Sequence, residues 1–329
     1  MSVFDLAHAR VGDRVQHQFL VAERSERQAS NGNPFVILSL INRTGRVDTS
    51  PIWSEKLAWV DGVEKGRIVQ IIGNVNEWGK DGQRKRQVDV TGPVHVVPVE
   101  QAKLEDFLPR ITDDPQVYWE RLDKARGKMK SQSLRRVVDL FFADDAFRER
   151  FERWPASVNA HHATVGGLLQ HVTEVAVFAH TMAATMGANA DLALTGALLH
   201  DIGKLEAYTI GAGGFAFTPA NALVGHVVLG LLMLEQRLPS LGDPPLSASQ
   251  LLELRHLILS HHGTLEFGSP VVPVTLEAEI VHWADEASAK ANDMGDALAD
   301  GSAFAEGEEV SQRIWRVGRK VWRRPHDWR

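Results

Sequence analysis

The spacing of apolar residues changes at about residue 100, and this change limits most strongly what the chain can fold into. Before that point, short segments rich in Val, Ile, Leu and aromatic residues alternate with glycine or Asn/Asp turns, a pattern typical of β-strands. The predicted strands are 14–22, 34–41, 47–53, 67–75 and 87–97. Five short strands in one small domain predict a closed barrel.

After residue 100 the apolar residues recur at helical spacing. The predicted helices are 116–130, 134–153, 164–187, 191–202, 222–238, 249–261 and 274–290. We therefore predict a multidomain α and β protein, with a five-stranded OB-fold barrel in residues 1–100 followed by an all-α domain in residues 156–295. Residues 101–155 would form a helical connector, and residues 296–329 an acidic linker with an Arg/Trp-rich tail.

Three local patterns predict helix ends. Asp191 is placed to cap the helix that follows it. Ser247 with Gln250 has the spacing of a capping box. Pro273 suits the first turn of the last predicted helix.

Composition excludes several classes of protein. The net charge of −6 argues against a protein that coats nucleic acid by bulk charge, although a local basic groove is compatible with it. The chain has no cysteine, so disulfides, iron–sulfur clusters and thiolate zinc sites are excluded. The N-terminus lacks a signal-peptide pattern, and the longest apolar stretch is shorter than the roughly 20 residues that span a bilayer. We expect a cytoplasmic protein that does not enter a membrane.

Seven imidazole and carboxylate residues predict one metal site. They are His171, His200, Asp201, His226, His261, His262 and Asp285. The adjacent pairs end apolar helices, where unpartnered polar groups would cost free energy. Seven such ligands suit two divalent ions that share a carboxylate, the usual apparatus for cutting phosphate esters. The alternative is a buried hydrogen-bond network of histidine and aspartate without metal.

The sequence motifs around these residues resemble those of a known family. The pattern His, His-Asp, Asp resembles the HD superfamily of metal-dependent phosphohydrolases. The motifs that carry a closer likeness are His-His-Ala at 161–163, Gly-Gly-Leu-Leu-Gln-His at 166–171, Leu-His-Asp-Ile-Gly-Lys at 199–204, Gly-His at 225–226 and Ser-His-His-Gly at 260–263. Together with the predicted barrel, they resemble the bacterial YhaM-type 3′-5′ exoribonucleases.

The resemblance implies a role for each residue. One ion would be held by His171, His200, Asp201 and Asp285, and a second by Asp201, as a bridge, with His226, His261 and His262. The two cations would be Mn²⁺ by preference, although Fe²⁺, Co²⁺, Ni²⁺ and Zn²⁺ accept the same ligands. Asp201 and Lys204 would act in catalysis, Lys204 by steadying a phosphate oxygen. His161 and His162 would contact the substrate or protonate the leaving group.

The resemblance thus implies a metal-dependent phosphodiesterase, a 3′-5′ exonuclease on single-stranded RNA or DNA. A first alternative is a phosphodiesterase for small or cyclic signalling nucleotides. Enzymes that open cyclic dinucleotides carry Gly-Tyr-Pro soon after the paired histidines, whereas this chain has Gly268-Ser269-Pro270, which weakens that alternative. A second alternative is a non-catalytic nucleic-acid-binding protein with a structural HD domain. The sequence leaves open whether the chain forms a homo-oligomer.

Two segments have the composition of nucleic-acid surfaces, because single strands bind through stacked aromatic rings and cations. The candidates in the barrel are Phe35, Trp53, Trp78, Lys80, Arg84, Lys85 and Arg86. In the tail, Arg and Trp residues alternate over 313–328. For the tail we expect docking onto the helical domain, with tryptophans as anchors, and keep base stacking as the alternative.

Overall fold

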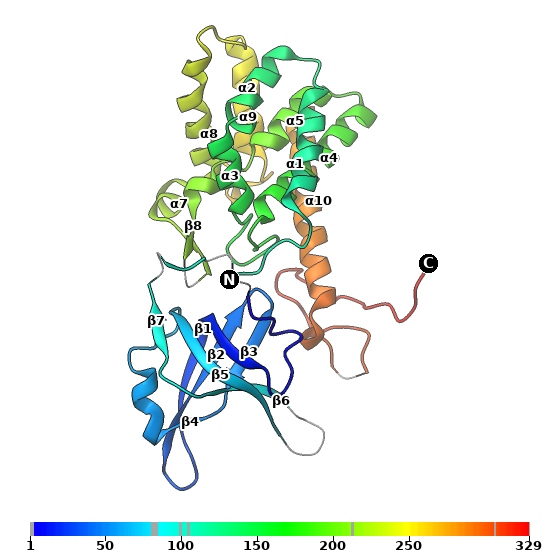
Figure 1. Cartoon of the computed structure of the whole chain (residues 1–329). Coiled ribbons are helices and arrows are strands. Elements are labelled where there is room, and N and C mark those ends of the chain that lie inside the picture. The colour runs from blue at the N-terminus through cyan, green and yellow to red at the C-terminus, as the bar shows by residue number, and fades with distance from the viewer. Residues whose placement is uncertain are drawn as a thin grey trace. The chain divides into compact units, whose positions relative to one another are not determined.

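The computed structural model describes residues 3–79, 85–98, 101–103, 106–211, 214–305 and 307–328. The chain divides into two compact units. The first comprises Met1–Arg110 with Ile210–Ala216, and the second comprises Ile111–Thr209 with Phe217–Arg329. Among the described residues, no helix is long and apolar enough to cross a membrane. The predicted fold class, a five-stranded barrel followed by a helical domain, is confirmed (Figure 1).

The first unit is the closed barrel. Its strands are β1 (Arg14–Gln28), β2 (Pro34–Asn42), β3 (Gly45–Thr49), β4 (Ile52–Trp53), β5 (Ile68–Trp78), β6 (Lys85–Val90) and β7 (His95–Val97). The strand order β1-β2-β3-β6-β5 closes because β1 also pairs with β5. All pairings in this ring are antiparallel except β3 with β6, which is parallel. Alternate apolar side chains such as Phe19, Leu38 and Ile71 fill the interior.

Three predicted strand boundaries were wrong. Segment 47–53 is two strands, β3 and β4, because Pro51 has no N–H for a ladder. Segment 87–97 is interrupted in the same way at Gly92-Pro93. Strand β1 runs on to Gln28, since its polar end still pairs with β2 through the backbone. The 3₁₀ helix η1 (Ser54–Val60) lies between β4 and β5.

The second unit is helical. Its α-helices are α1 (Pro115–Gly127), α2 (Gln132–Phe142), α3 (Asp145–Arg153), α4 (Gly167–Met186), α5 (Ala190–Leu199), α6 (Lys204–Ala207), α7 (Pro219–Val224), α8 (His226–Arg237), α9 (Ala248–Ser260) and α10 (Leu276–Ala299). Its short elements are the 3₁₀ turns η4 (Leu238–Leu241), η5 (Leu265–Phe267) and η6 (Gly301–Ala303). The chain also forms a hairpin of the strands β8 (Tyr208–Gly211) and β9 (Gly214–Phe217), most of which lies in the stretch Ile210–Ala216 that belongs to the first unit. This hairpin interrupts the segment that was expected to be all-α.

Two of the predicted helices are in fact pairs. Helix α2 ends at Phe142, and Asp144 caps α3, with its carboxylate accepting from the N–H groups of Ala146 and Phe147. Gly225, with φ of 80°, separates α7 from α8. Both breaks turn the chain, so that the helices that follow pack on one apolar core.

That core is centred on α4, α5 and α10 and includes α1, α2 and α3. Helices α4 and α5 contribute fully buried side chains such as Leu168, Leu194 and Leu198. Helix α10 packs against both of them. The apolar packing holds three helices in fixed register, and each of them carries or precedes a residue of the predicted metal site.

Candidate metal centre

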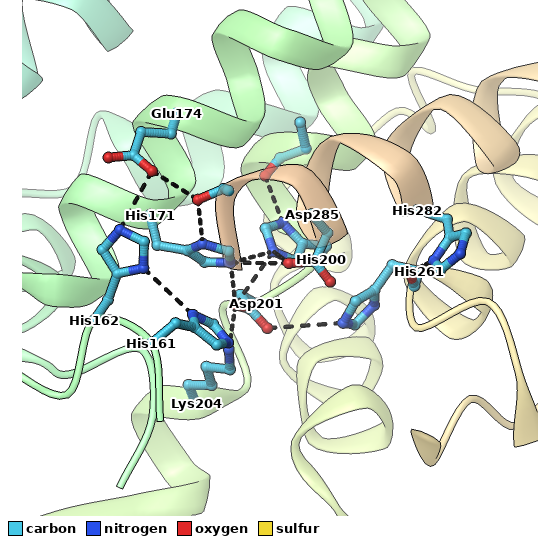
Figure 2. Close-up of polar contacts among 12 residues, drawn as sticks. His161, His162, His171, Glu174, His200, Asp201, Lys204, His261, His282 and Asp285 are labelled. Carbon is cyan, nitrogen blue, oxygen red and sulfur yellow. Dashed lines mark hydrogen bonds and ion pairs between the residues drawn. The ribbon is translucent and has the colours of Figure 1, made fainter. Parts of the chain in front are cut away.

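The centre is organised around Asp201, whose two carboxylate oxygens face two different groups of ligand atoms (Figure 2). Asp201 follows α5 directly after His200 and is buried. Its Oδ2 lies 3.2 Å from His200 Nε2 and 3.3 Å from His171 Nε2. Its Oδ1 lies 3.5 Å from His226 Nε2 and 3.7 Å from His261 Nε2. One carboxylate thus stands between two sets of imidazoles.

The first group comes from three packed helices. His171 lies on α4, His200 at the end of α5 and Asp285 on α10. Asp285 Oδ1 lies 3.0 Å from His171 Nε2, and the two Nε2 atoms of His171 and His200 are 3.4 Å apart. The ligand atoms of all three residues lie within 4.8 Å of one another, as a shared cation requires.

The second group is formed by the start of α8 and the end of α9. His226 is the first residue of α8, and His261 and His262 follow α9. Their ligand atoms also lie within 4.8 Å of one another. Among the described residues, the buried atoms without a hydrogen-bond partner include Asp201 Oδ1, His226 Nε2 and His261 Nε2. Such atoms are costly unless something else satisfies them.

Hydrogen bonds on the far side of the rings fix which nitrogen faces the centre. Nδ1 of His200 lies 2.7 Å from the carbonyl of Ala197, and Nδ1 of His261 lies 2.7 Å from that of Ile258. Nδ1 of His262 lies 2.6 Å from the Phe267 carbonyl. A carbonyl only accepts, so each Nδ1 carries a proton, and Nε2 is the ring nitrogen that faces the centre.

The charges in the centre also suit cation binding. Burial would raise the pKa of Asp201, but His200 and Lys204 outweigh it and hold that pKa well below its usual range. Burial would also raise the pKa of Asp285, but its hydrogen bond with His171 outweighs burial and holds that pKa well below its usual range. Burial lowers the pKa of His226 to about 3 and that of His261 well below its usual value. Ionised carboxylates and neutral imidazoles are the forms that bind metal.

The seven predicted residues therefore lie together and fit a pair of divalent cations. The unpartnered atoms are nitrogen and oxygen donors that point at the same space, and the donor set matches mid-to-late first-row metals. When bound, such cations supply Lewis acidity that activates a water molecule and stabilises negative charge on phosphate oxygens.

Lys204 also lies in the centre. Its ammonium group contacts Asp201 Oδ2, and the side chain is buried. Burial alone would lower the pKa of Lys204, but the charge of Asp201 outweighs it and raises that pKa. Lys204 is thus a fixed positive charge beside the carboxylate of Asp201.

His161 and His162 lie next to His171 rather than inside either ligand group. Their rings are 5.1 and 5.3 Å from that of His171, and His161, His162 and His171 offer ligand atoms within 4.8 Å of one another. Burial lowers the pKa of His161 to about 2 and also lowers that of His162. A neutral His161 is a poor acid for a leaving group, so the geometry favours substrate contact for this residue.

The sequence interpretation missed three residues that support the ligands. Ser288 Oγ donates to Glu174 Oε2 at 2.7 Å and lies 3.0 Å from His171 Nδ1. Nδ1 of His282 donates to the carbonyl of His261 at 2.9 Å. Helical spacing was the available signal, because Glu174 and Ser288 each follow a ligand by three residues and so share its helix face.

Gly203 allows the second group to approach the first. A Cβ atom at this position would lie 2.0 Å from the carbonyl oxygen of His226 and 2.3 Å from the backbone nitrogen of Gly230. Both contacts are with backbone, which cannot rotate away. The glycine therefore permits α8 to pack against the turn that carries Asp201.

The candidate nucleic-acid residues of the barrel fall into two described pairs. Phe35 and Trp53 are cross-strand neighbours whose rings are 4.9 Å apart, and Trp53 is partly exposed. Trp78, which is 72% exposed, pairs in register with the exposed Lys85. Arg86 donates to the carbonyls of Ala7 and Ala9, whereas Lys80 and Arg84 lie outside the described residues.

Comparisons with known proteins agree with this geometry. Residues 168–290 match the HD domain family. The chain is 26% identical over 324 residues to the 3′-5′ exoribonuclease YhaM of Oceanobacillus iheyensis, covering 98% of this chain and 97% of the relative. It is 29% identical over 289 residues to the protein of that name from Bacillus subtilis, with 88% of each chain covered. Over most of its length the chain is thus similar to proteins named 3′-5′ exoribonuclease YhaM, and its residues 168–290 match an HD domain.

Proposed function

We propose that this protein is a metal-dependent 3′-5′ exonuclease that removes nucleotides from single-stranded RNA. It would use two divalent cations, with Mn²⁺ preferred, held by His171, His200, Asp201 and Asp285 on one side and by Asp201, His226, His261 and His262 on the other. The relatives named 3′-5′ exoribonuclease support the reaction and the substrate class. The proposal places the enzyme in the cytoplasm with its RNA.

The position of Asp201 is the observation that carries the proposal. A carboxylate with one oxygen toward each imidazole group is the ligand that a pair of divalent cations would share. A hydrogen-bond network without metal would not explain why Nε2 of His226 and Nε2 of His261 are buried without a hydrogen-bond partner.

The chain's own residues would divide the remaining work. Lys204, kept positive and buried beside Asp201, is placed to contact a non-bridging phosphate oxygen and to stabilise its developing charge. His161 and His162 border the first group and would contact the terminal nucleotide. Neither imidazole is protonated at neutral pH, so their contribution is positioning.

The barrel would guide the strand. Phe35 with Trp53, and Trp78 with Lys85, offer rings for base stacking, the last of them beside a cation for phosphate. Lys80, Arg84 and Arg86 complete this predicted surface. Base stacking tolerates any sequence, which suits an enzyme that degrades strands progressively.

The test is hydrolysis of 5′-labelled single-stranded RNA with Mn²⁺, read as a ladder that shortens from the 3′ end. Asp201→Asn should abolish the ladder and reduce bound metal, whereas Asp293→Asn, at a buried acid of α10 outside both ligand groups, should retain both. Products from mono- or dinucleotides alone would favour the small-nucleotide alternative. A full ladder from Asp201→Asn would refute the assignment.

A further inference from the structure

The C-terminal segment presents a second aromatic and basic surface, which we call the tail surface. It consists of the tryptophans Trp315, Trp322 and Trp328, the ring of His326 and the cations Arg313, Arg319, Lys320 and Arg324. The three tryptophans are 75%, 53% and 81% exposed. The expectation that tryptophans anchor the tail was therefore wrong.

Other residues hold the tail in place. Ser311 and Val321 are buried, and their backbones are joined by a hydrogen bond of 2.9 Å. A second hydrogen bond, of 3.1 Å, joins Ile314 N to the carbonyl of Arg319, so the segment folds back on itself. Arg323 donates to the carbonyl of Leu298, near the end of α10. The tryptophans are thus exposed on an ordered support, which leads away from α10 in Figure 1.

Exposed tryptophans on an ordered backbone mark a binding surface, because burying them is worth more than leaving them in water. The rings of Trp322 and His326 are 6.1 Å apart, and those of His326 and Trp328 are 5.3 Å apart. Trp315 lies at the turn of the same segment. Several ring faces are therefore available within one short stretch.

The charge of the segment identifies the chemistry of its ligand. Residues 310–328 contain six Lys or Arg and one Asp, in a chain whose net charge is −6. Arg313, Arg319, Lys320 and Arg324 are exposed, and the described part of the chain offers none of them an ion-pair partner. Aromatic faces interleaved with unpaired cations complement stacked bases linked by phosphates.

The tail surface and the metal centre are joined by one rigid element. Asp285 lies on α10, and the tail follows the end of that helix at Ala299. Fourteen residues of α-helix correspond to about 21 Å. A strand that has its 3′ end in the metal centre must be longer than a dinucleotide to reach the tail surface.

We infer that the tail surface binds single-stranded RNA upstream of the nucleotide being removed, by stacking on Trp315, Trp322 and Trp328 and by phosphate contacts. This inference rests on the proposed function for its substrate class. The tail surface would make the affinity for RNA increase with length while leaving the chemistry to the HD domain.

The test is the affinity of the full-length chain for a fluorescein-labelled 20-nucleotide oligouridine, measured by fluorescence anisotropy in EDTA so that no cleavage occurs. Each tryptophan that stacks should weaken binding about fivefold or more when replaced by Ala, so the variant W315A/W322A/W328A should lose well over tenfold. Trp283→Ala is the matched control, since Trp283 is 54% exposed on α10 outside the tail, and its affinity should not change.

A second variant tests the cations by a different readout. R319A/K320A/R324A should lower the slope of log affinity against log salt concentration by about two, at about 0.7 per phosphate contact. Unchanged affinity in the tryptophan variant, an equal loss in Trp283→Ala, or an unchanged salt slope would each overturn the inference. A tryptophan variant that loses only self-association, with RNA affinity intact, would show that a second copy occupies the surface and would also overturn it.

The binding measurement is independent of hydrolysis, so the two proposals can fail separately. An unaltered chain that cleaves no RNA, but loses RNA affinity when the tryptophans are replaced, refutes the proposed function and supports the tail surface. If the unaltered chain cleaves RNA but the tail variants bind RNA with normal affinity, the proposed function is supported and the tail surface is refuted.

Discussion

Replacing Ser288 by alanine tests how the fold prepares His171 to bind a cation. The Ser288 hydroxyl is fully buried and has a single proton, which it donates to Glu174 at 2.7 Å. The pKa of Glu174 is lowered to about 2, because its contacts with His162 and Ser288 outweigh burial, which would raise that pKa. The same hydroxyl oxygen must therefore accept from Nδ1 of His171 at 3.0 Å, which fixes the ring with Nε2 facing Asp201 and Asp285, the position in which it would bind a cation shared with them.

The size of the effect follows from these two hydrogen bonds. In Ser288→Ala the buried Nδ1–H of His171 loses its acceptor, which costs about 1–3 kcal/mol. Removal of a group that orients a metal ligand typically weakens binding about 10–100-fold, or about 1.4–2.7 kcal/mol. We expect the loss at the cation that contacts His171, while the site of His226, His261 and His262 keeps its affinity.

The assay is competition for Mn²⁺ against a fluorescent chelator, which resolves two sites in the full-length protein. Ser260→Ala is the matched control, because its buried hydroxyl donates only to the carbonyl of His256 within α9. Both variants should lower the midpoint of thermal unfolding, but only Ser288→Ala should weaken metal binding. If both bind two cations as the unaltered protein does, Ser288 is merely structural and the reasoning about His171 is refuted.

Three further predictions concern the same centre. Gly203→Ala should destabilise the protein by about 1–3 kcal/mol or more and lower the number of bound metal ions, because its Cβ would meet the backbone of His226. Denaturant unfolding and elemental analysis measure these two effects. Normal values for both would contradict the packing argument. Glu174→Gln should lower the free energy of unfolding at pH 7, and by progressively less as the pH falls from about 5 to 2. The ionised Glu174 stabilises the fold above its unfolded pKa of 4.5, and this contribution is lost as the pH falls through its folded pKa of about 2. A loss of unfolding free energy that does not depend on pH would exclude this role. Removal of metal should lower the midpoint of thermal unfolding. Free Mn²⁺ at about 100 times its dissociation constant should restore about 2.7 kcal/mol of unfolding free energy. Asp201→Asn, whose fold should persist, should show a much smaller metal-dependent shift.

The fold class could be predicted because each unit repeats one simple period. Alternating residues of a closed barrel and the helical spacing of α4 or α9 are local properties of the sequence. The capping box of Ser247 and Gln250 is equally local, and it is present in the structure. Each of these features needs only the residues within one element, so sequence alone contains the information.

Helix ends were predicted less well where distant residues decide them. Asp191 was expected to cap its helix, but Asn189 is the cap and accepts from the N–H of Leu192. The Asp191 carboxylate instead accepts from the N–H groups of Lys130 and Ser131, some 60 residues earlier in the chain. Pro273 likewise precedes the helix, which begins after the cap Thr275. Local sequence does not show whether a carboxylate such as that of Asp191 accepts from its own helix or from a distant part of the chain.

The site residues were recognisable for the opposite reason, because they are out of place in their local surroundings. His200 and Asp201 end an otherwise apolar helix, and the cost of burying them without partners indicates a shared ligand. Glu174 and Ser288 offered only their spacing of three residues from a ligand, which is weak evidence because a single polar residue on a half-buried helix face is ordinary. Their role exists only once α4 and α10 are packed together, when one hydroxyl connects a carboxylate on the first helix to a ligand on that same helix. Residues that bind can thus be identified by their cost, whereas residues that orient them require the tertiary structure.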